Sequence, residues 1–238
     1  MTNTFRRLLL ATSICVVFSS HSLADAPYGP ALEDLLSDAA PALDRQVLGK
    51  AVAAMQCATR NGVAPAQRLA VIDFSLPSSV PRLWIFDLER HTLVLEELVA
   101  HGQNSGEDMA TSFSNVVGSY QSSIGLFRTQ ESYFGRHGYS LRMDGLEPGI
   151  NDKARERAIV VHAADYVDPE WIVRQGRIGR SQGCPAVRPE VAEQVVDSLK
   201  DGQFMFAYYP DPEWLTSSAY LNCEPQRIAA IRESRPGS

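Results

Sequence analysis

One cysteine lies in a glycine-rich run that reads Gly179-Arg180-Ser181-Gln182-Gly183-Cys184-Pro185, just before a helix predicted over residues 189–199. Backbone N–H groups of such a loop can stabilise the thiolate, which is the nucleophilic form of cysteine. Gly183 allows a carbonyl group to approach the main chain closely, and the N–H groups of Gln182, Gly183 and Cys184 could form an oxyanion hole. The run therefore predicts a nucleophilic Cys184, with an inert loop cysteine as the alternative.

A nucleophilic cysteine needs a general base, and histidine suits this role because its ordinary pKa lies near 6.5. Four histidines follow residue 24, and all of them precede Cys184. This order excludes papain-like and NlpC/P60-like cysteine peptidases, in which the nucleophile comes first. His91 falls in a predicted hairpin turn and His101 begins a polar loop, so both are expected at the solvated surface, while His137 has no assigned role. His162 ends a predicted buried strand and is our candidate base, with a strand-capping role as the alternative.

The first 24 residues have the pattern of a secretory signal peptide. Arg6 and Arg7 precede an apolar run from Leu8 to Phe18, and Ser22-Leu23-Ala24 supplies small residues at a cleavage point. The apolar run is shorter than the roughly 20 residues that span a bilayer, so an uncleaved anchor is the less favoured alternative. The sequence predicts export across the inner membrane to the periplasm or cell envelope, and a mature chain with no transmembrane span.

Cysteine usage after residue 24 gives an odd number. Cys57, Cys184 and Cys223 remain, and pairing in an oxidising compartment leaves one of three thiols over. We expect Cys57 to pair with Cys223, which leaves Cys184 free. A bridge that includes Cys184 is the alternative.

The composition is that of an ordinary globular protein. The chain has 238 residues, 45% of them hydrophobic and 21% charged, which allows one domain or a small pair. Without residues 1–24 it has 20 basic and 28 acidic side chains, a balance that argues against binding nucleic acid. Neither a His-x-x-x-His nor a Cys-x-x-Cys spacing occurs, so no metal or other cofactor is expected.

Helical spacing of apolar residues dominates the region before residue 62, and strand patterns dominate the middle of the chain. We expect an α+β fold, rich in β-strands, in which helices flank a β core. The predicted strands are 69–74, 83–88, 93–100, 139–143, 158–162 and 203–209, and a further strand near Gly125 follows a long polar loop over 101–123. The predicted segments are a signal peptide (1–24), an N-terminal helical segment (25–68), a central domain (69–209), and a C-terminal strap and tail (210–238) with one short helix and a disordered tip.

The order of these residues resembles a known family. His162, then Gly179, then Ser181-Gln182-Gly183-Cys184 is similar to the signature of the L,D-transpeptidase catalytic domain (YkuD-like), in which a histidine precedes a glycine and Ser-x-Gly-Cys. The chain most resembles the murein branch of bacterial envelopes. The likeness runs from about Leu69 to Tyr209, and it includes Gly125-Leu126-Phe127, which resembles the strand before the histidine in that family. It implies a YkuD-like β-sandwich or barrel core with flanking helices.

The resemblance also implies an activity on peptidoglycan stem peptides, at the bond between residue three and D-Ala four. Cys184 would attack the carbonyl of residue three, His162 would handle the proton, and main-chain N–H groups around Gly183 would hold the oxyanion. The supporting residues of the motif would be Gly179, Ser181 and Gln182. D-Ala would leave, and a thioester would remain until an amine completed an L,D-transpeptidase reaction or water completed an L,D-carboxypeptidase reaction.

Three positions depart from the family pattern. Gln182 stands where many members have His, and Ala163 follows the histidine where Gly is usual, at a point where a main-chain carbonyl orients the imidazole. Ala186 stands where most members have Arg, so Arg180 and Arg188 become the candidates for binding a substrate carboxylate, with surface ion pairs as the alternative. An inactive relative that binds peptidoglycan or an envelope protein is the second functional hypothesis.

Overall fold

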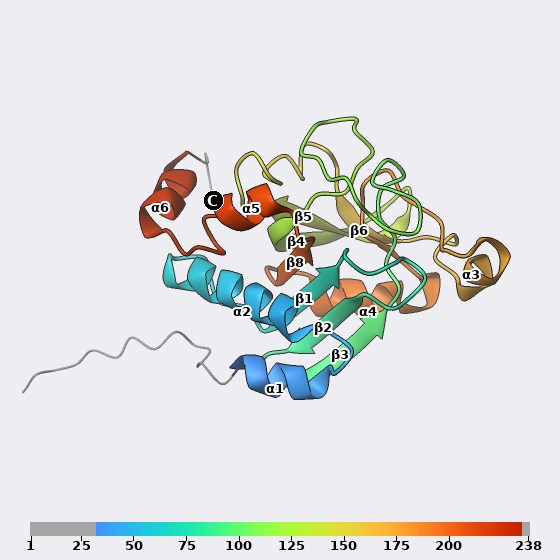
Figure 1. Cartoon of the computed structure of the whole chain (residues 1–238), viewed down its shortest axis with the longest axis horizontal. Helices are drawn as coiled ribbons and strands as arrows, with labels where there is room; N and C mark the ends of the chain where they lie inside the picture. Colours follow the sequence, from blue (N-terminus) through green and yellow to red (C-terminus); the bar gives the residue numbers. More distant parts are fainter. Residues whose placement is uncertain (1–31, 235–238) are drawn as a thin grey trace, which may run out of the picture.

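The fold is one mixed eight-stranded sheet, curved towards a barrel, with helices packed around it (Figure 1), in a computed structural model that describes residues 32–234. The strands are β1 (Arg68–Asp73), β2 (Leu83–Asp87), β3 (Thr92–Glu97), β4 (Gly125–Gly135), β5 (Gly138–Gly145), β6 (Val160–Ala163), β7 (Ala186–Val187) and β8 (Phe204–Tyr208). Their order is β3-β2-β1-β8-β4-β5-β6-β7. Neighbouring strands are antiparallel except β1 with β8 and β6 with β7. The expected α+β class with a β-rich core is confirmed.

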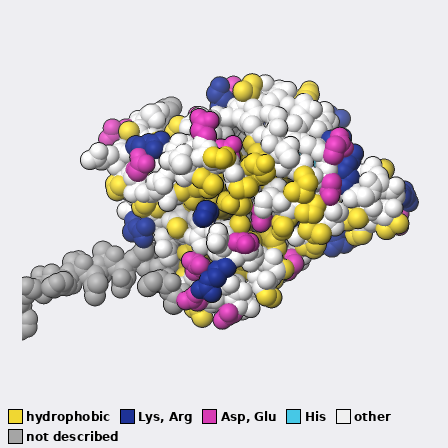
Figure 2. Space-filling model, viewed as in Figure 1, with side chains coloured by type: hydrophobic (Ala, Val, Ile, Leu, Met, Phe, Trp, Pro, Cys, Tyr) yellow, Lys and Arg dark blue, Asp and Glu magenta, His cyan; other side chains and the backbone are white. Residues whose placement is uncertain are grey.

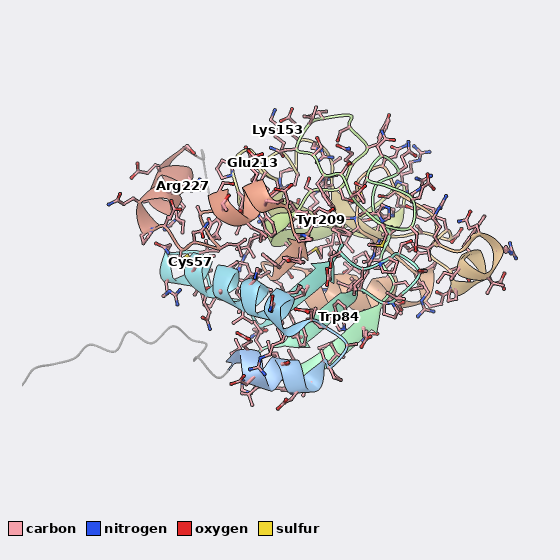
Figure 3. The ribbon with its side chains drawn as sticks, viewed as in Figure 1. Cys57, Trp84, Lys153, Tyr209, Glu213 and Arg227 are labelled. Carbon is pink, nitrogen blue, oxygen red and sulfur yellow. A yellow bond between two sulfur atoms is a disulfide. The ribbon has the colours of Figure 1, made fainter. Side chains whose placement is uncertain are left out.

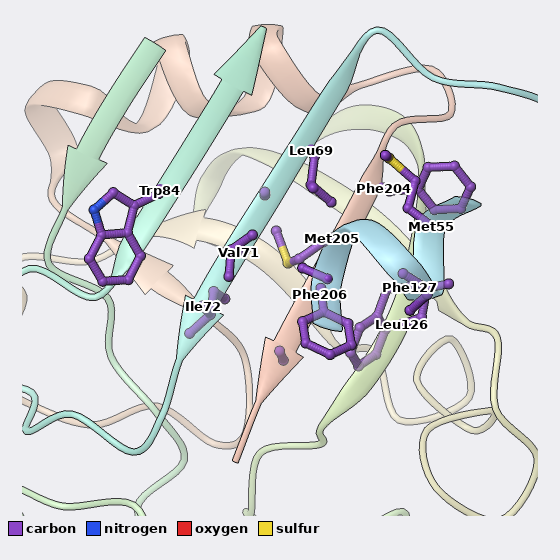
Figure 4. Packing of buried hydrophobic residues seen from close by; sticks show 14 of the residues in the cluster. Met55, Leu69, Val71, Ile72, Trp84, Leu126, Phe127, Phe204, Met205 and Phe206 are labelled. Carbon is purple, nitrogen blue, oxygen red and sulfur yellow. The ribbon is translucent and has the colours of Figure 1, made fainter. Parts of the chain in front are cut away.

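Six helices lie within the described residues: α1 (Leu32–Ala39), α2 (Arg45–Arg60), α3 (Pro169–Gln175), α4 (Pro189–Leu199), α5 (Pro212–Ser217) and α6 (Pro225–Glu233). α2 contacts β1, β4 and β8, whereas α4 contacts β1, β5 and β6. Figure 4 shows α2 in front of the sheet and α4 behind it. α4 has the bounds that the sequence predicts, and α3 was not predicted.

α2 forms because its sequence supplies both an N-cap and an apolar face. The side chain of Asp44 accepts hydrogen bonds from the N–H groups of Gln46 and Val47 at the start of the helix. Buried residues then recur along one side: Val47, Leu48, Ala51, Val52, Ala54, Met55, Cys57 and Ala58. That side packs on the sheet, so the N-terminal helical segment contributes to the same core as the strands.

A single large hydrophobic cluster connects the N-terminal helices, the sheet and the C-terminal strap. β1 and β8 lie at its centre, because both strands are paired on two sides and nearly all of their side chains are buried. Figure 4 shows Val71 and Ile72 of β1 near Met205 and Phe206 of β8, with Leu126 of β4 on the other side. Burial of side chains of this size contributes roughly 2 kcal/mol each to folding.

The C-terminal strap contains two helices, so the prediction of a single short helix was wrong. Pro212 and Pro225 each stand in the first turn of a helix, a position that suits proline. The side chain of Asp211 also caps α5 by accepting the N–H of Trp214 at 2.7 Å. Trp214 is buried against the core and its Nε1–H donates to Glu147 at 3.1 Å, which fixes the strap to the body of the protein.

A disulfide joins Cys57 of α2 to Cys223, just before α6, and closes a span of 166 residues. Figure 3 shows Cys57 at the end of α2 that faces the strap. Cys184 is the free cysteine. The structure therefore contains the pairing that the odd cysteine count favoured.

The predicted signal peptide (1–24) and the last part of the predicted tail (235–238) lie outside the described residues. Within residues 32–234, no helix is both long enough and apolar enough to cross a bilayer. Basic and acidic side chains are interspersed over the face shown in Figure 2, while hydrophobic side chains gather in a band across its middle.

Candidate active site

A cavity of about 510 Å³ opens at the end of β6, and both members of the predicted nucleophile–base pair line it. Cys184, Ser181 and Gln182 come from the glycine-rich run, and His162 comes from β6. The β4–β5 hairpin supplies another wall, and the loops over 101–123 and 146–158 and the loop that follows β6 supply the rest. Six separate parts of the chain thus meet at one concave site, the usual setting for ligand binding.

Strand pairing brings the cysteine and the histidine together across 22 positions of sequence. β6 and β7 are parallel, and His162 lies opposite Ala186 in their register. Cys184 is two positions before Ala186, so it enters the cavity beside the strand that carries His162.

His162 is buried, and a main-chain carbonyl fixes its tautomer. Its Nδ1 lies 2.8 Å from the oxygen of Ala163, and because a carbonyl only accepts, Nδ1 carries the hydrogen and Nε2 is the basic nitrogen. Burial lowers the pKa of His162; the hydrogen bond to Ala163 opposes this effect, and the nearby His137 adds to it. The imidazole is therefore neutral at pH 7, the form in which it can accept a proton.

The Cys184 thiol is partly exposed at the cavity. Its Sγ lies 3.7 Å from the main-chain oxygen of Ala158, which accepts the S–H. Burial raises the pKa of the Cys184 thiol, whereas a hydrogen bond with the main chain of Val160 and the positive charge of Arg157 act in the opposite direction. The thiol is thus protonated at rest, and the groups that favour its ionisation belong to the same cavity.

Ser181 holds the loop that carries the cysteine. Its Oγ donates to the oxygen of Cys184 at 2.6 Å and accepts the N–H of Gly183 at 3.0 Å. Gly183 has φ +119°, and a β-carbon there would lie 2.8 Å from the oxygen of Gln121, so only glycine fits. Of the three N–H groups predicted to form the oxyanion hole, that of Gly183 donates to Ser181, whereas those of Gln182 and Cys184 have no partner among the described residues.

Gly179 allows a tyrosine to reach the cavity. A β-carbon at position 179 would lie 2.4 Å from Cβ of Tyr166, and the N–H of Gly179 donates to the oxygen of Tyr166 at 2.7 Å. Burial raises the pKa of Tyr166 to about 12, and the nearby Cys184 adds to the shift. The phenol is therefore a hydrogen-bond donor at neutral pH. Sequence reasoning missed Tyr166 because it lies in a loop outside the motif.

The two arginines proposed from the sequence lie in different places. Arg180 lines the cavity, and its Nη1 donates to Glu107 at 2.8 Å and to the oxygen of Gly106 at 2.7 Å. Arg188 does not line this cavity, and its Nη2 pairs with the buried carboxylate of Glu97 at 2.5 Å. Of these two arginines, only Arg180 can contact a ligand that binds beside Cys184.

A second histidine lies against the candidate base. His137 is in the two-residue turn between β4 and β5, and its ring lies 4.4 Å from that of His162, with the planes at 31°. Tyr133 and Arg136 of the same hairpin also line the cavity. Gly135 and Gly138 on either side of the turn indicate a hairpin in the sequence. They do not indicate that the turn places His137 against His162.

His101 is fully buried, so its predicted place at the solvated surface was wrong. Its Nδ1 accepts a hydrogen bond from the equally buried Arg82 at 2.7 Å, and its main-chain oxygen accepts the N–H of Ser181 at 2.9 Å. Burial and the charge of Arg82 lower the pKa of His101 to about 4. The main chain of His101 thus binds the loop that carries Cys184. His91 is exposed, as expected.

Comparison with protein families identifies the family of this chain. The family model for the L,D-transpeptidase catalytic domain matches residues 39–208, which confirms the resemblance. A solved L,D-transpeptidase from Mycobacterium smegmatis is similar at 14% identity with a TM-score of 0.38, covering 61% of this chain and 60% of that one. One from Stackebrandtia nassauensis is similar at 12% identity and a TM-score of 0.37, covering 78% and 94%. The chain thus spans less than two thirds of the mycobacterial protein. No curated protein matches.

Proposed function

Since this chain belongs to the L,D-transpeptidase catalytic-domain family, we propose that it is an exported cysteine acyltransferase that acts on the tetrapeptide stems of peptidoglycan. The observation that carries the proposal is the cavity itself, which is lined by both the free thiol of Cys184 and the imidazole of His162. The match to the family model covers the elements that supply both residues.

In the first step, the proton of Cys184 passes to Nε2 of His162 and Sγ attacks the carbonyl carbon of the third stem residue. The oxyanion is held by the free N–H groups of the cysteine loop, with Gln182 and Cys184 as the donors, because the N–H of Gly183 is already bound to Ser181. As the tetrahedral intermediate collapses, the bond to D-Ala four breaks. The departing nitrogen takes the proton from His162, and the acyl group remains on Cys184 as a thioester.

In the second step, an acceptor attacks the thioester and His162 removes its proton. An amine gives a new amide bond, which is transpeptidation; water gives a shortened stem, which is L,D-carboxypeptidase activity. In both cases the sulfur leaves as a thiolate and recovers its proton from His162. The residues that perform the two reactions are the same.

Arg180 is the proposed partner for a carboxylate of the stem. It lines the cavity with Cys184, and its present partner Glu107 is exposed, so a substrate carboxylate can replace it at little cost. Tyr166 supplies a phenolic donor on the same wall. A cavity of about 510 Å³ has the size of a small-molecule binding site.

Export is supported by the cysteines as well as by the N-terminal pattern. A structural disulfide such as Cys57–Cys223 is characteristic of proteins that fold outside the reducing cytosol. Peptidoglycan stems lie in that same compartment. We therefore propose a periplasmic or envelope location.

The test is to incubate the purified mature protein with a defined disaccharide-tetrapeptide and to identify the products by mass. Release of D-Ala with a tripeptide, a cross-linked dimer or an exchanged D-amino acid supports the proposal and identifies the acceptor. Cys184→Ala should abolish this release and also acylation by a carbapenem. The matched control is the Cys57→Ala/Cys223→Ala protein, which lacks two other sulfurs and should retain both reactions while folded. Release of D-Ala at the normal rate by Cys184→Ala would refute the assignment.

One observation favours the second hypothesis, that of an inactive relative that only binds peptidoglycan. Burial raises the pKa of Cys184 and lowers that of His162, and both effects favour the neutral pair. An inert thiol resists alkylating agents below pH 8, whereas an activated one reacts. Alkylation of Cys184 as a function of pH therefore separates the two hypotheses.

A further inference from the structure

A partly buried cysteine and a buried histidine do not readily form a thiolate and an imidazolium, because each charge loses part of its hydration. The site must contain something that favours the anion if Cys184 acts as the nucleophile. Main-chain N–H groups favour it only in part, since that of Gly183 is already used. A fixed positive charge beside the sulfur is the remaining way to do so within this cavity.

We propose that Arg157 is the positioning residue that keeps Cys184 ionisable, by placing a positive charge without a carboxylate partner next to its sulfur. The inference rests on the proposed role of Cys184 as nucleophile, and it assigns a task to a residue outside the motif. Arg157 directly precedes Ala158, whose oxygen accepts the S–H of Cys184.

The guanidinium of Arg157 is held in place by neutral groups. Its Nη1 donates to the oxygen of Ser114 and, at 2.5 Å, to Oγ of Ser123. Its Nη2 donates to the oxygen of Gln121 at 2.6 Å and to Oγ of Ser119 at 3.1 Å. All four partners belong to the polar loop over 101–123, and none carries a charge. The hydrogen bonds therefore fix the position of the guanidinium without neutralising it.

The same guanidinium lies against the cysteine loop. A β-carbon at Gly183 would lie 3.4 Å from Nη2 of Arg157, and Arg157 lines the cavity with Cys184. The interaction is mutual: the thiolate of Cys184 raises the pKa of Arg157 against the effect of burial, and Arg157 lowers that of Cys184. Because the cavity is partly shielded from water, a charge that lines it acts more strongly on the sulfur than a charge on an open surface.

Other charged groups face the cysteine, but none replaces Arg157. Arg180 is paired with the carboxylate of Glu107, and Arg136 is exposed at the hairpin turn, where water screens its charge. The remaining titratable groups that line the cavity are Tyr120, Tyr133, His137, His162 and Tyr166. None of these is an arginine or a lysine, and His162 is the proposed base itself.

The test follows alkylation of Cys184 by iodoacetamide across pH, read by mass, in the disulfide-bonded mature protein. Arg157→Gln should slow alkylation at pH 7 about tenfold and move the midpoint of the profile to higher pH. Arg157→Lys keeps the charge but cannot make the four-bond fork, so its midpoint should stay near that of the wild type.

Two controls separate the effect of the Arg157 charge from that of its hydrogen bonds to the loop over 101–123. Ser123→Ala removes one hydrogen bond of the fork and no charge, and Arg155→Gln removes a nearby arginine that is paired with Asp144 and Glu131 and does not line the cavity. Both should leave the midpoint unchanged.

The proposal is overturned by an unchanged midpoint in folded Arg157→Gln, or by a shift in Ser123→Ala as large as in Arg157→Gln. If Arg157→Gln does not fold, Arg157→Lys decides, because a tenfold slower reaction with the charge retained excludes the charge as the cause. Alkylation needs no stem peptide. Failure of the wild type to release D-Ala therefore counts against the proposed function, and failure of the profile to depend on residue 157 counts against this inference.

Discussion

The two sides of the molecule are held together by different forces. The apolar half, defined as α1, α2, β1, β2, β8 and α6, packs through the large hydrophobic cluster and is closed by the Cys57–Cys223 disulfide. The loop half, defined as residues 98–123, 146–158 and 164–183, contributes fewer residues to that cluster, among them Val99, Ala110 and Ala154, and most of a second, much smaller cluster. Its segments are joined by side chains that donate to main-chain carbonyls, as Arg157 and Arg82 do. The disulfide and most of the large cluster lie in the apolar half, whereas most residues that line the cavity come from the loop half.

This division explains why the cavity can hold charged and polar groups in fixed positions. Buried polar groups are costly unless each one finds a hydrogen-bond partner, and a network with every partner in place is rigid. Asn151, for example, donates to the oxygens of Ile124 and Leu126, while Glu147 accepts from the N–H of Leu126 and from Trp214. The loops around the site are therefore held in shape by hydrogen bonds in addition to the few residues that they contribute to the large cluster.

The largest expected effect tests the apolar half. Cys57→Ala/Cys223→Ala should lower the free energy of unfolding by about 4 kcal/mol, because the bridge closes a long loop. Urea unfolding measures this loss, with Cys184→Ala as a control that removes a sulfur without a bridge. Alkylation of Cys184 in the folded double variant should match that of the wild type. A changed alkylation profile would show that loss of the disulfide alters the cavity, which would contradict the proposed independence of the two halves.

The next effect belongs to His101 in the loop half. Its pKa is about 4 in the folded protein and near 6.5 when unfolded, so the unfolded chain binds the proton first as the pH falls. The stability that His101 supplies is complete above pH 6.5 and is lost progressively towards pH 4, by about 3 kcal/mol. His101→Asn keeps an acceptor for Arg82 but does not titrate, so this part of the pH dependence should vanish. Urea unfolding at pH 7, 5.5 and 4 measures the free energy of unfolding of the wild type and of His101→Asn, with His91→Asn as the control. An equal decrease with pH in the wild type and His101→Asn would contradict the prediction.

A third effect concerns the geometry of the cysteine loop. Gly183→Ala should reduce D-Ala release about hundredfold, because the added carbon meets the oxygen of Gln121 and displaces Cys184. Gly149→Ala is the matched control, since Gly149 also has a positive φ but has open space around its α-carbon. Equal activity of the two variants would mean that crowding at position 183 is harmless.

The smallest effect is a shift in pH dependence. His137 lowers the pKa of His162, so His137→Asn should raise it. The acid limb of the rate profile for D-Ala release should then move to higher pH, because His162 must be neutral to accept a proton. His91→Asn serves as the control on an exposed histidine. An unmoved acid limb would mean that the contact between the two rings has no electrostatic effect.

Apolar periodicity predicted the sheet well, since β1, β2 and β8 have the predicted positions to within one or two residues. The candidate site was predicted only in part. The glycine-rich run predicted Cys184, and the strand that ends near His162 predicted the base. Tyr166, Arg157 and His137 were missed because side chains that meet through loops have no sequence period. The prediction of a surface position for His101 was wrong for a related reason. His101 begins a polar loop in the sequence, but in the fold it is buried and bonded to Arg82, which lies before β2 and far from it in sequence.

The order of the three cysteines has a consequence for how the protein is made. A chain that crosses a membrane from its N-terminus presents Cys57, then Cys184, and only then Cys223. The first sulfur offered to Cys57 is therefore that of Cys184, the proposed nucleophile, and a bridge between them would be non-native and would block the proposed reaction. Correct maturation requires that the C-terminal strap dock before oxidation is complete, or that a thiol–disulfide isomerase undo the wrong link. By bringing Cys223 to Cys57, the C-terminal strap thus leaves Cys184 as the free thiol.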